Sequence, residues 1–183
     1  MIKPSKVKPK KRRGLLRRFL RRNEGTAAIE FAIVSLPFFI LLFATVESFV
    51  AVFAGQVLDT AVADSSRLIR TGQAQTQGFN EADFTQTVCE RAVMFLDCEN
   101  TMMIDVRTYT DFNDADFTDP IDGDGNVEDD DFDFDMGARN EIVVVRVYYP
   151  WPIVTDYLGA FLSNVSGNKR LLVATSAFRN EPF

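Results

Sequence analysis

Charged residues are almost absent from one stretch near the N-terminus of this chain. Residues 31–46 read FAIVSLPFFILLFATV, 16 residues without a charge. With its flanks the apolar tract covers Thr26–Gly55, in which only Glu30 and Glu47 are charged. A helix of about 20 apolar residues spans the hydrocarbon core of a bilayer. The tract therefore predicts one transmembrane helix over residues 26–55.

The helical pattern continues beyond this tract. Apolar side chains recur at spacings of three and four residues as far as Ile69, and Gly72 is a suitable stop. We therefore expect one helix from about Thr26 to about Thr71. Its first part would lie in the membrane, and residues 56–72 would continue outside it.

Shorter segments of mixed period make up residues 73–183. A polar, Gln-rich linker is expected over residues 72–78, a second helix over Glu81–Leu96 and a short helix over Asp156–Leu162. Alternation of β-branched and aromatic residues predicts three strands. These are Met102–Thr110, Glu141–Tyr149 and Arg170–Phe178, with Pro150-Trp151-Pro152 ending the second. The expected fold class is α+β: a long N-terminal helix, then a small exported domain of two helices and an antiparallel sheet of about three strands.

Charge divides the 183 residues into two regions. Residues 1–25 contain 11 Lys or Arg and one acidic residue, a net charge of +10, whereas residues 26–183 have a net charge of −16. A basic segment directly before a span predicts a cytoplasmic N-terminus. We therefore expect residues 1–25 to be a basic leader in contact with membrane lipid, and residues 73–183 to lie outside the cytoplasm. An acidic exterior argues against nucleic acid as a partner.

Glu30 is the feature that an ordinary anchor leaves unexplained, because a carboxylate in an apolar helix is costly in lipid. If the chain were cut after Gly25, Thr26 would carry a new ammonium group. The carboxylate of Glu30 could then pair with that ammonium on a neighbouring subunit and set the register of assembly. A signal peptide cut before Gly55 is an alternative, but its apolar region would be unusually long.

The segment GTAAIEFAIVSLPFFILLFATVE, residues 25–47, resembles the TadE-like minor pseudopilins of the tight-adherence (Tad) pilus system. Further blocks resemble the same family, at residues 88–98, 104–109, 145–152 and 178–183. The resemblance implies a pilin-like N-terminal helix and a processing site formed by Gly25, Thr26, Glu30 and Phe31. It implies a prepilin peptidase, other Tad pilins or pseudopilins and an inner-membrane assembly platform as partners.

Two cysteines, Cys89 and Cys98, fall in the exported part, where disulfides persist. Residues nine apart on a straight helix lie too far apart to bond. If they pair, the helix must end between them. We predict a structural disulfide.

An acidic segment, residues 111–135, holds 12 acidic residues and no basic one. Part of it matches the ligand positions of a calcium-binding EF-hand loop: Asp122, Asp124, Asn126, Glu128, Asp130 and Asp133. Val127, however, stands at the sixth position, where such a loop needs Gly. Two interpretations stay open, weak Ca²⁺ binding and a solvated acidic loop.

An enzyme is not expected, since the chain has no His, no nucleophile–base set and no phosphate-binding loop. No cofactor is expected apart from that Ca²⁺. The resemblance implies a non-catalytic assembly or accessory subunit of a Tad pilus, held in the inner membrane by a single span. Two locations stay open, a platform at the membrane and a place in the filament. The alternative is an uncleaved single-pass protein whose exported acidic domain binds a partner or Ca²⁺.

Overall fold

The computed structural model describes residues 25–92, 96–97, 101–115 and 117–183. The described chain divides into an N-terminal part that ends at Phe43 and a compact unit from Ala44 to Phe183, and each is described by itself. The expected leader, residues 1–25, lies outside the described residues apart from Gly25.

The first element is a 45-residue helix, α2, Thr26–Arg70. Its bounds confirm the single long helix that the apolar spacing predicts. The helix ends because Gly72 adopts a left-handed conformation, with φ of 75°, which glycine tolerates better than other residues. Arg67 and Arg70 lie in its last turn, where positive charge favours the carboxyl end of a helix.

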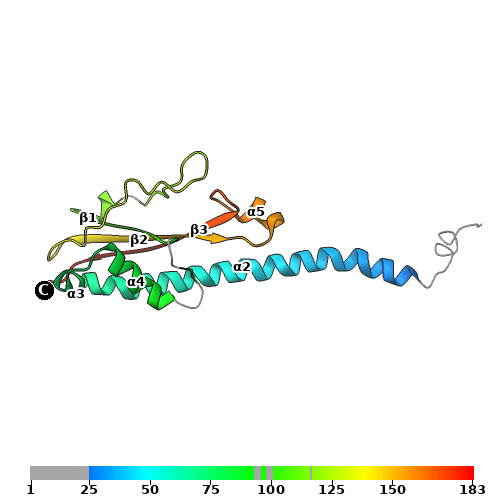
Figure 1. Cartoon of the computed structure of the whole chain (residues 1–183), viewed down its shortest axis with the longest axis horizontal. Helices are drawn as coiled ribbons and strands as arrows, with labels where there is room; N and C mark the ends of the chain where they lie inside the picture. The colour runs from blue at the N-terminus through cyan, green and yellow to red at the C-terminus, as the bar shows by residue number, and fades with distance from the viewer. Residues whose placement is uncertain (1–24, 93–95, 98–100, 116) are drawn as a thin grey trace, which may run out of the picture. The chain divides into compact units, whose positions relative to one another are not determined.

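In its described residues, the compact unit continues with three further helices, a short 3₁₀ helix and three strands (Figure 1). The strands form one antiparallel sheet in the order β1-β2-β3, which confirms the α+β class. In chain order the elements after α2 are α3 Gln73–Gln77, α4 Glu81–Ala92, β1 Met103–Tyr109, η2 Phe112–Asp114, β2 Ile142–Pro152, α5 Asp156–Leu162 and β3 Lys169–Arg179.

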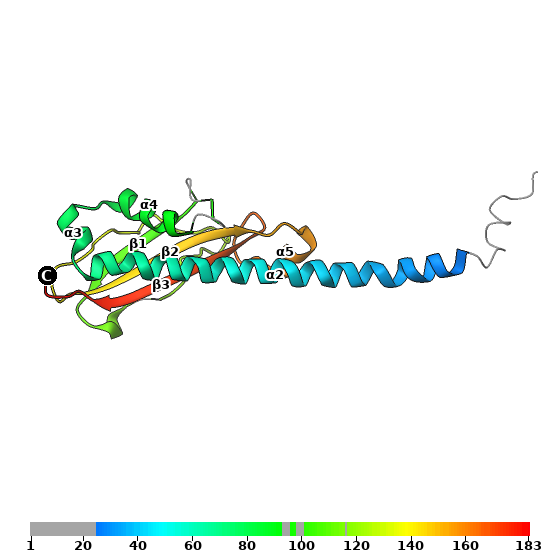
Figure 2. The same ribbon diagram turned by 90° about the horizontal axis from the view of Figure 1, so that it is seen from below.

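The main core lies between the sheet and the helices α2 and α4. Both ribbon views show the second half of α2 running along one face of the sheet (Figures 1 and 2). Alternate residues of β2 face this side, as a period of two requires. The core residues are Val143, Val145, Val147 and Tyr149 from β2, Leu58, Val62 and Ile69 from α2, and Phe84 and Val88 from α4.

The acidic segment covers the opposite face of the sheet, which the sequence did not indicate (Figure 1). Tyr148 is fully buried there, and its ring stacks on Phe132 with 5.2 Å between centroids. At the sheet edge, Val106 donates its N–H to Asp133 O and accepts from Asp135 N, both at 2.8 Å. The backbone of the segment is therefore packed, although most of its carboxylates stay exposed.

Buried charges hold this second face together. The carboxylate of Asp105, which is 1% exposed, accepts from Arg146 Nη2 at 2.7 Å and from Arg107 Nε at 2.7 Å. Arg146 also donates to Thr118 O at 3.3 Å, and Asp133 donates its N–H to Asp105 at 3.2 Å. A buried ion pair needs such additional hydrogen bonds to offset its loss of hydration.

The predicted end of the second strand is wrong: β2 continues through Pro150 to Pro152 and pairs with β3 up to Lys169. The partner on its other side stops earlier, since β1 pairs with β2 only as far as Tyr148. Beyond that residue β2 is an edge strand, where a missing N–H is tolerated. Pro150 and Pro152 are two residues apart, so both face the same side.

Three other boundaries can be compared. The predicted short helix over Asp156–Leu162 is confirmed. The expected linker after Gly72 instead contains the short helix α3, bounded by two left-handed glycines, Gly72 and Gly78. The helix α4 ends at Ala92, and Leu96, its expected end, is not helical.

Candidate processing and assembly site

The predicted cleavage position lies at the first turn of α2. Gly25 immediately precedes the helix, and Thr26 is its first residue and is exposed. A Cβ added to Gly25 would meet no atom within 4 Å. Packing within the described chain therefore does not require glycine at this position, and a requirement for glycine would have to come from a partner.

Glu30 and Phe31 lie one turn further along α2, and both are exposed. Thr26 and Glu30 are four residues apart, so they share one face of the helix. The two residues that are expected to pair between subunits therefore lie on one exposed face of α2; the pairing itself stays a prediction.

Large apolar side chains cover all sides of α2 after this turn. From Ile29 to Phe43 they are between 41% and 71% exposed. Soluble proteins rarely expose contiguous apolar surface on this scale, and it marks contact with a membrane or a partner. Among the described residues, one helix, α2, is both long enough and apolar enough to cross a membrane, as judged by its length and composition.

The same helix becomes part of a core from Ala51 onward. Its buried residues recur every three or four positions and face the sheet; they are Ala51, Ala54, Leu58, Ala61, Val62, Ser65, Ser66 and Ile69. One element therefore serves two purposes, an apolar surface first and a scaffold for the domain afterwards.

Glu47 makes a contact that the sequence analysis missed. Its Oε1 accepts from the backbone N–H of Val154 at 2.5 Å and of Thr155 at 3.2 Å. The other oxygen, Oε2, is buried without a hydrogen-bond partner among the described residues. The available signal was a lone carboxylate that interrupts an apolar run, because such a group needs a partner. The identity of that partner could not be read from the sequence.

Of the two cysteines in the predicted disulfide, one lies among the described residues. Cys89 lies in the last part of α4, which ends at Ala92, so a helix end between the two cysteines agrees with the bridge. Cys98 lies outside the described residues. The pairing of Cys89 with Cys98 stays a prediction.

The calcium hypothesis concerns six residues that are all described. Asp122 Oδ1 accepts from Asp124 N at 2.9 Å and from Asn126 N at 2.7 Å, and Oδ2 accepts from Asn126 Nδ2 at 3.0 Å. These hydrogen bonds, chiefly those from Asn126, lower the pKa of Asp122. Within the described ranges no three acidic side chains are grouped so that they could hold a metal ion. The loop geometry therefore gives Ca²⁺ binding no support.

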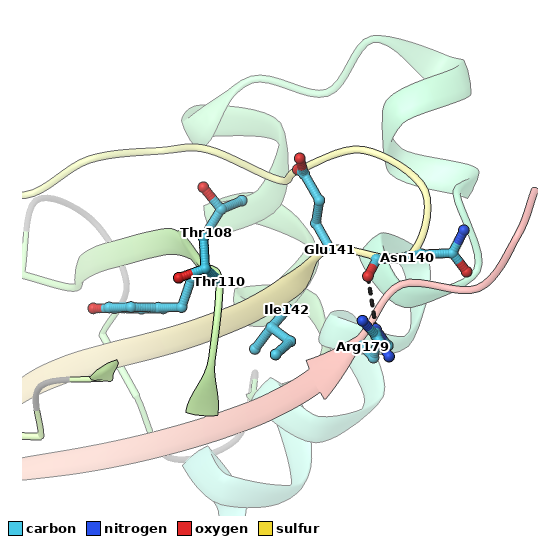
Figure 3. A pocket seen from close by; sticks show the side chains of 7 residues that line it. Thr108, Thr110, Asn140, Glu141, Ile142 and Arg179 are labelled. Carbon is cyan, nitrogen blue, oxygen red and sulfur yellow. Dashed lines mark hydrogen bonds between the residues drawn. The ribbon is translucent and has the colours of Figure 1, made fainter. Parts of the chain in front are cut away.

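A polar pocket of about 250 Å³ lies at the far end of the sheet (Figure 3). Thr108, Thr110, Glu141 and Arg179 contribute polar groups to its lining. The guanidinium of Arg179 donates from Nε to Asn140 O at 2.7 Å, a hydrogen bond that stabilises the fold (Figure 3). Glu141 Oε2 likewise accepts from Ala138 N at 2.7 Å.

The comparison with known protein families finds a match in the segment of α2 that carries the candidate site. Residues 25–67 match the model of a family described as TadE-like protein. No curated protein and no solved structure matches the chain. The matched range begins at Gly25 and includes Glu30, Phe31 and Glu47. Through this segment the chain is similar to the TadE-like proteins of the Tad pilus system, as the sequence resemblance implied.

Proposed function

We propose that this protein is a minor pseudopilin, a non-catalytic assembly or accessory subunit in the biogenesis of a Tad (Flp) pilus for surface adherence. The observation that carries the proposal is the start of α2. An apolar helix exposed on all sides begins one residue after Gly25 and presents Glu30 on the same face as Thr26.

The chain is held in the inner membrane by α2, with the N-terminus in the cytoplasm and the domain in the periplasm. The net charge of +10 on residues 1–25 supports this orientation. A prepilin peptidase at the cytoplasmic face of the membrane cuts between Gly25 and Thr26. The partners of the mature protein are other Tad pilins or pseudopilins and the inner-membrane assembly platform.

The carboxylate of Glu30 sets the register in this assembly. In lipid, its charge is costly until it meets the ammonium group of Thr26 on a neighbouring subunit. Only one stagger of neighbouring helices brings the two groups together, so burial in the wrong register leaves both charges unpaired and is disfavoured.

Processing is tested by the intact mass of the protein purified from cells with and without the peptidase. We expect a mature form that begins at Thr26 only when the peptidase is present. The variant Gly25→Leu should remain full-length. Gly55→Leu is the matched control, because a Cβ at Gly55 also meets nothing within 4 Å, and it should be processed normally.

A full-length chain in cells that contain active peptidase would favour the uncleaved anchor instead. A product that begins at Gly55 would favour a secretory signal peptide. Either result would exclude the proposed maturation.

The register role of Glu30 is tested separately from cleavage. Glu30→Ala should be processed normally but should assemble poorly, as measured by sedimented pili and by crosslinking of the protein to pilins. Glu90→Ala removes an exposed carboxylate from α4 and is the control. Normal piliation with Glu30→Ala would refute the register role.

A further inference from the structure

The connection between β2 and β3 forms a defined surface, which we call the base and which comprises residues 153–170. Ile153 donates its N–H to Asn168 O at 3.0 Å, and Asn168 Nδ2 donates to Ile153 O at 2.9 Å. The helix α5 packs closely on the same residue: a Cβ on Gly159 would lie 1.3 Å from Asn168 Oδ1. These contacts give the base a fixed shape.

Two apolar side chains project from the base. Val154 is 85% exposed and Phe161 is 75% exposed, more than any large apolar residue on α2, where Phe31 and Phe49 reach 71%. Side chains this exposed contribute little to the stability of the domain in water. Both side chains therefore leave most of their apolar surface accessible to a membrane or to another protein.

Glu47 fixes the level of the base along α2. Its Oε1 accepts from Val154 N and Thr155 N, so the base starts beside this residue. Beyond Glu47 the helix still exposes Phe49 (71%), Val52 (64%) and Phe53 (52%). Phe53 is six residues further on, a rise of about 9 Å. The base thus begins at a level where the outward face of α2 is still apolar.

Charge does not oppose contact of the base with a membrane. Residues 153–170 contain one acidic residue and two basic ones, Lys169 and Arg170, whereas residues 26–183 as a whole have a net charge of −16. Arg170 lies at the start of β3 and donates to Leu162 O at 3.2 Å. The acidic segment touches the base where Ser166 N donates to Gly125 O at 2.7 Å. Positive and negative groups are therefore both present near the base.

We propose that the base rests in the outer headgroup layer of the membrane and inserts Val154 and Phe161 toward the acyl chains. This inference depends on α2 crossing the membrane, because the apolar surface of α2 between Val46 and Phe53 is continuous with the base at Glu47. Interfacial insertion to a depth of about 5–10 Å is typical of apolar side chains presented in this way. The domain is then held at the membrane surface by two attachments, α2 and the base.

The test uses the full chain in nanodiscs of zwitterionic lipid and a single fluorescent reporter. Trp151 is the chain's one tryptophan, and Trp151→Phe provides the background. Into it, Phe161→Trp places a reporter on the base. Phe39→Trp marks the span, and Phe112→Trp is the matched exposed control at the opposite end of the sheet. Phe112 is 49% exposed, and the 11 residues of β2 separate that end from the base by about 35 Å.

A mixture of lipids brominated near the glycerol end and near the middle of the acyl chain quenches only tryptophans that enter the membrane, at either depth. We expect strong quenching at positions 39 and 161 and little at position 112, with the reverse order for aqueous iodide. Quenching at position 39 with none at position 161 would overturn the contact of the base with the membrane but would leave the span in place. The apolar surface of the base would then be available to a partner protein. A lack of quenching at position 39 would show that α2 does not cross the membrane, and would thereby also overturn the proposed contact of the base.

Discussion

Among the described residues, the carboxylates of Asp105 and Glu47 are partly or wholly withdrawn from water, and each accepts hydrogen bonds from specific donors. Asp105 lies beneath the acidic segment with Arg107 and Arg146, whereas Glu47 accepts two backbone N–H groups. Withdrawal of a charge from water is costly unless hydrogen bonds replace its hydration. At the scale of single residues, these two groups therefore hold segments that are distant in sequence.

Glu47→Ala should loosen the base without unfolding the domain. The substitution leaves the N–H groups of Val154 and Thr155 without their acceptor, at a cost of about 1–2 kcal/mol. We expect amide hydrogen exchange at these two residues to accelerate by about 5- to 30-fold. Glu47→Gln is the control, because its amide oxygen can still accept. Unchanged exchange in Glu47→Ala would show that the contact contributes no stability.

Tyr148 should make the stability of the domain depend on alkaline pH. Burial is the main reason that the pKa of its phenol is raised from 10.0 to about 12. A proton held more tightly in the folded state stabilises the fold fully below pH 10, and this contribution is lost as pH rises toward 12. Urea unfolding followed by Trp151 fluorescence should show stability falling across this window.

Tyr148→Phe should flatten that decline. Its hydroxyl has no hydrogen-bond partner among the described residues, so removal at neutral pH should change stability by less than about 1 kcal/mol. An alkaline decline as steep in Tyr148→Phe as in the parent chain would assign the dependence to other groups.

At the scale of elements, the C-terminal tail, residues 180–183, packs against the end of α2. Arg70 forms an ion pair with Glu181 at 3.2 Å, and Glu181 N donates to Arg70 O at 2.9 Å. The ring of Phe183 lies directly on Gly72, where a Cβ would approach it to 2.1 Å. Asn180, buried at 3% exposure, donates to Met136 O and Ala138 O, both at 3.0 Å. The tail therefore joins the helix end to the loop before β2.

Gly72→Ala should destabilise the domain more than Gly78→Ala. Both glycines are left-handed, with φ of 75° and 68°, so each substitution costs about 1–2 kcal/mol in backbone strain. Only at Gly72 must the new methyl group displace a ring, which adds about 1–3 kcal/mol. Urea denaturation of the full chain in detergent measures both effects.

Deletion of Phe183 is the complementary experiment. In a chain without this residue the excess cost at Gly72 should disappear, and the two alanine variants should then be equally destabilised. An excess that persists would place its origin outside the contact with Phe183.

At the scale of the whole molecule, cleavage would change the charge more than any other event. The precursor carries −6 in formal charge and has a sequence pI of about 4.7. Removal of residues 1–25 takes away a net +10 and leaves −16 on the side chains. The mature protein would then be a strongly acidic domain preceded by an apolar tract, Thr26–Gly55, in which only Glu30 and Glu47 are charged.

Isoelectric focusing should therefore separate precursor from product. We expect the processed chain to focus below pH 4.7, since acidic groups then outnumber basic ones by a wider margin. Gly25→Leu should keep the precursor position. A single band at the precursor position in peptidase-positive cells would argue against removal of the leader.

Much of the fold followed from local pattern. The bounds of α2 and of the short α5, and the presence of three strands, were predictable because an apolar period of 3.6 or 2 is a property of neighbouring residues. The end of α2 near Gly72 was predictable for the same reason, because glycine readily adopts the left-handed conformation that often ends a helix. The candidate processing site also lies within one contiguous stretch, residues 25–31, and needs no tertiary contact to be recognised.

The contacts that the sequence did not reveal join segments that are far apart along the chain. Glu47 and Val154 are separated by 107 positions, and no local period indicates that they meet. Pro150 and Pro152 are accepted in β2 because β1 begins only at Met103, beside Tyr148, and so does not pair with the two prolines. Neither interpretation of the acidic segment, weak Ca²⁺ binding or a solvated loop, included the contacts by which Asp105 and Arg146 anchor its backbone on the sheet.

The sequence by itself determined which segments are helix, strand and apolar surface, because those properties depend on residues a few positions apart. Only the tertiary structure decided where the charges of Glu47 and Asp105 find donors and which face the acidic segment covers. It alone showed that the base begins beside the apolar part of α2. These outcomes depend on desolvation and pairing between distant residues, and they arise only when the chain packs together.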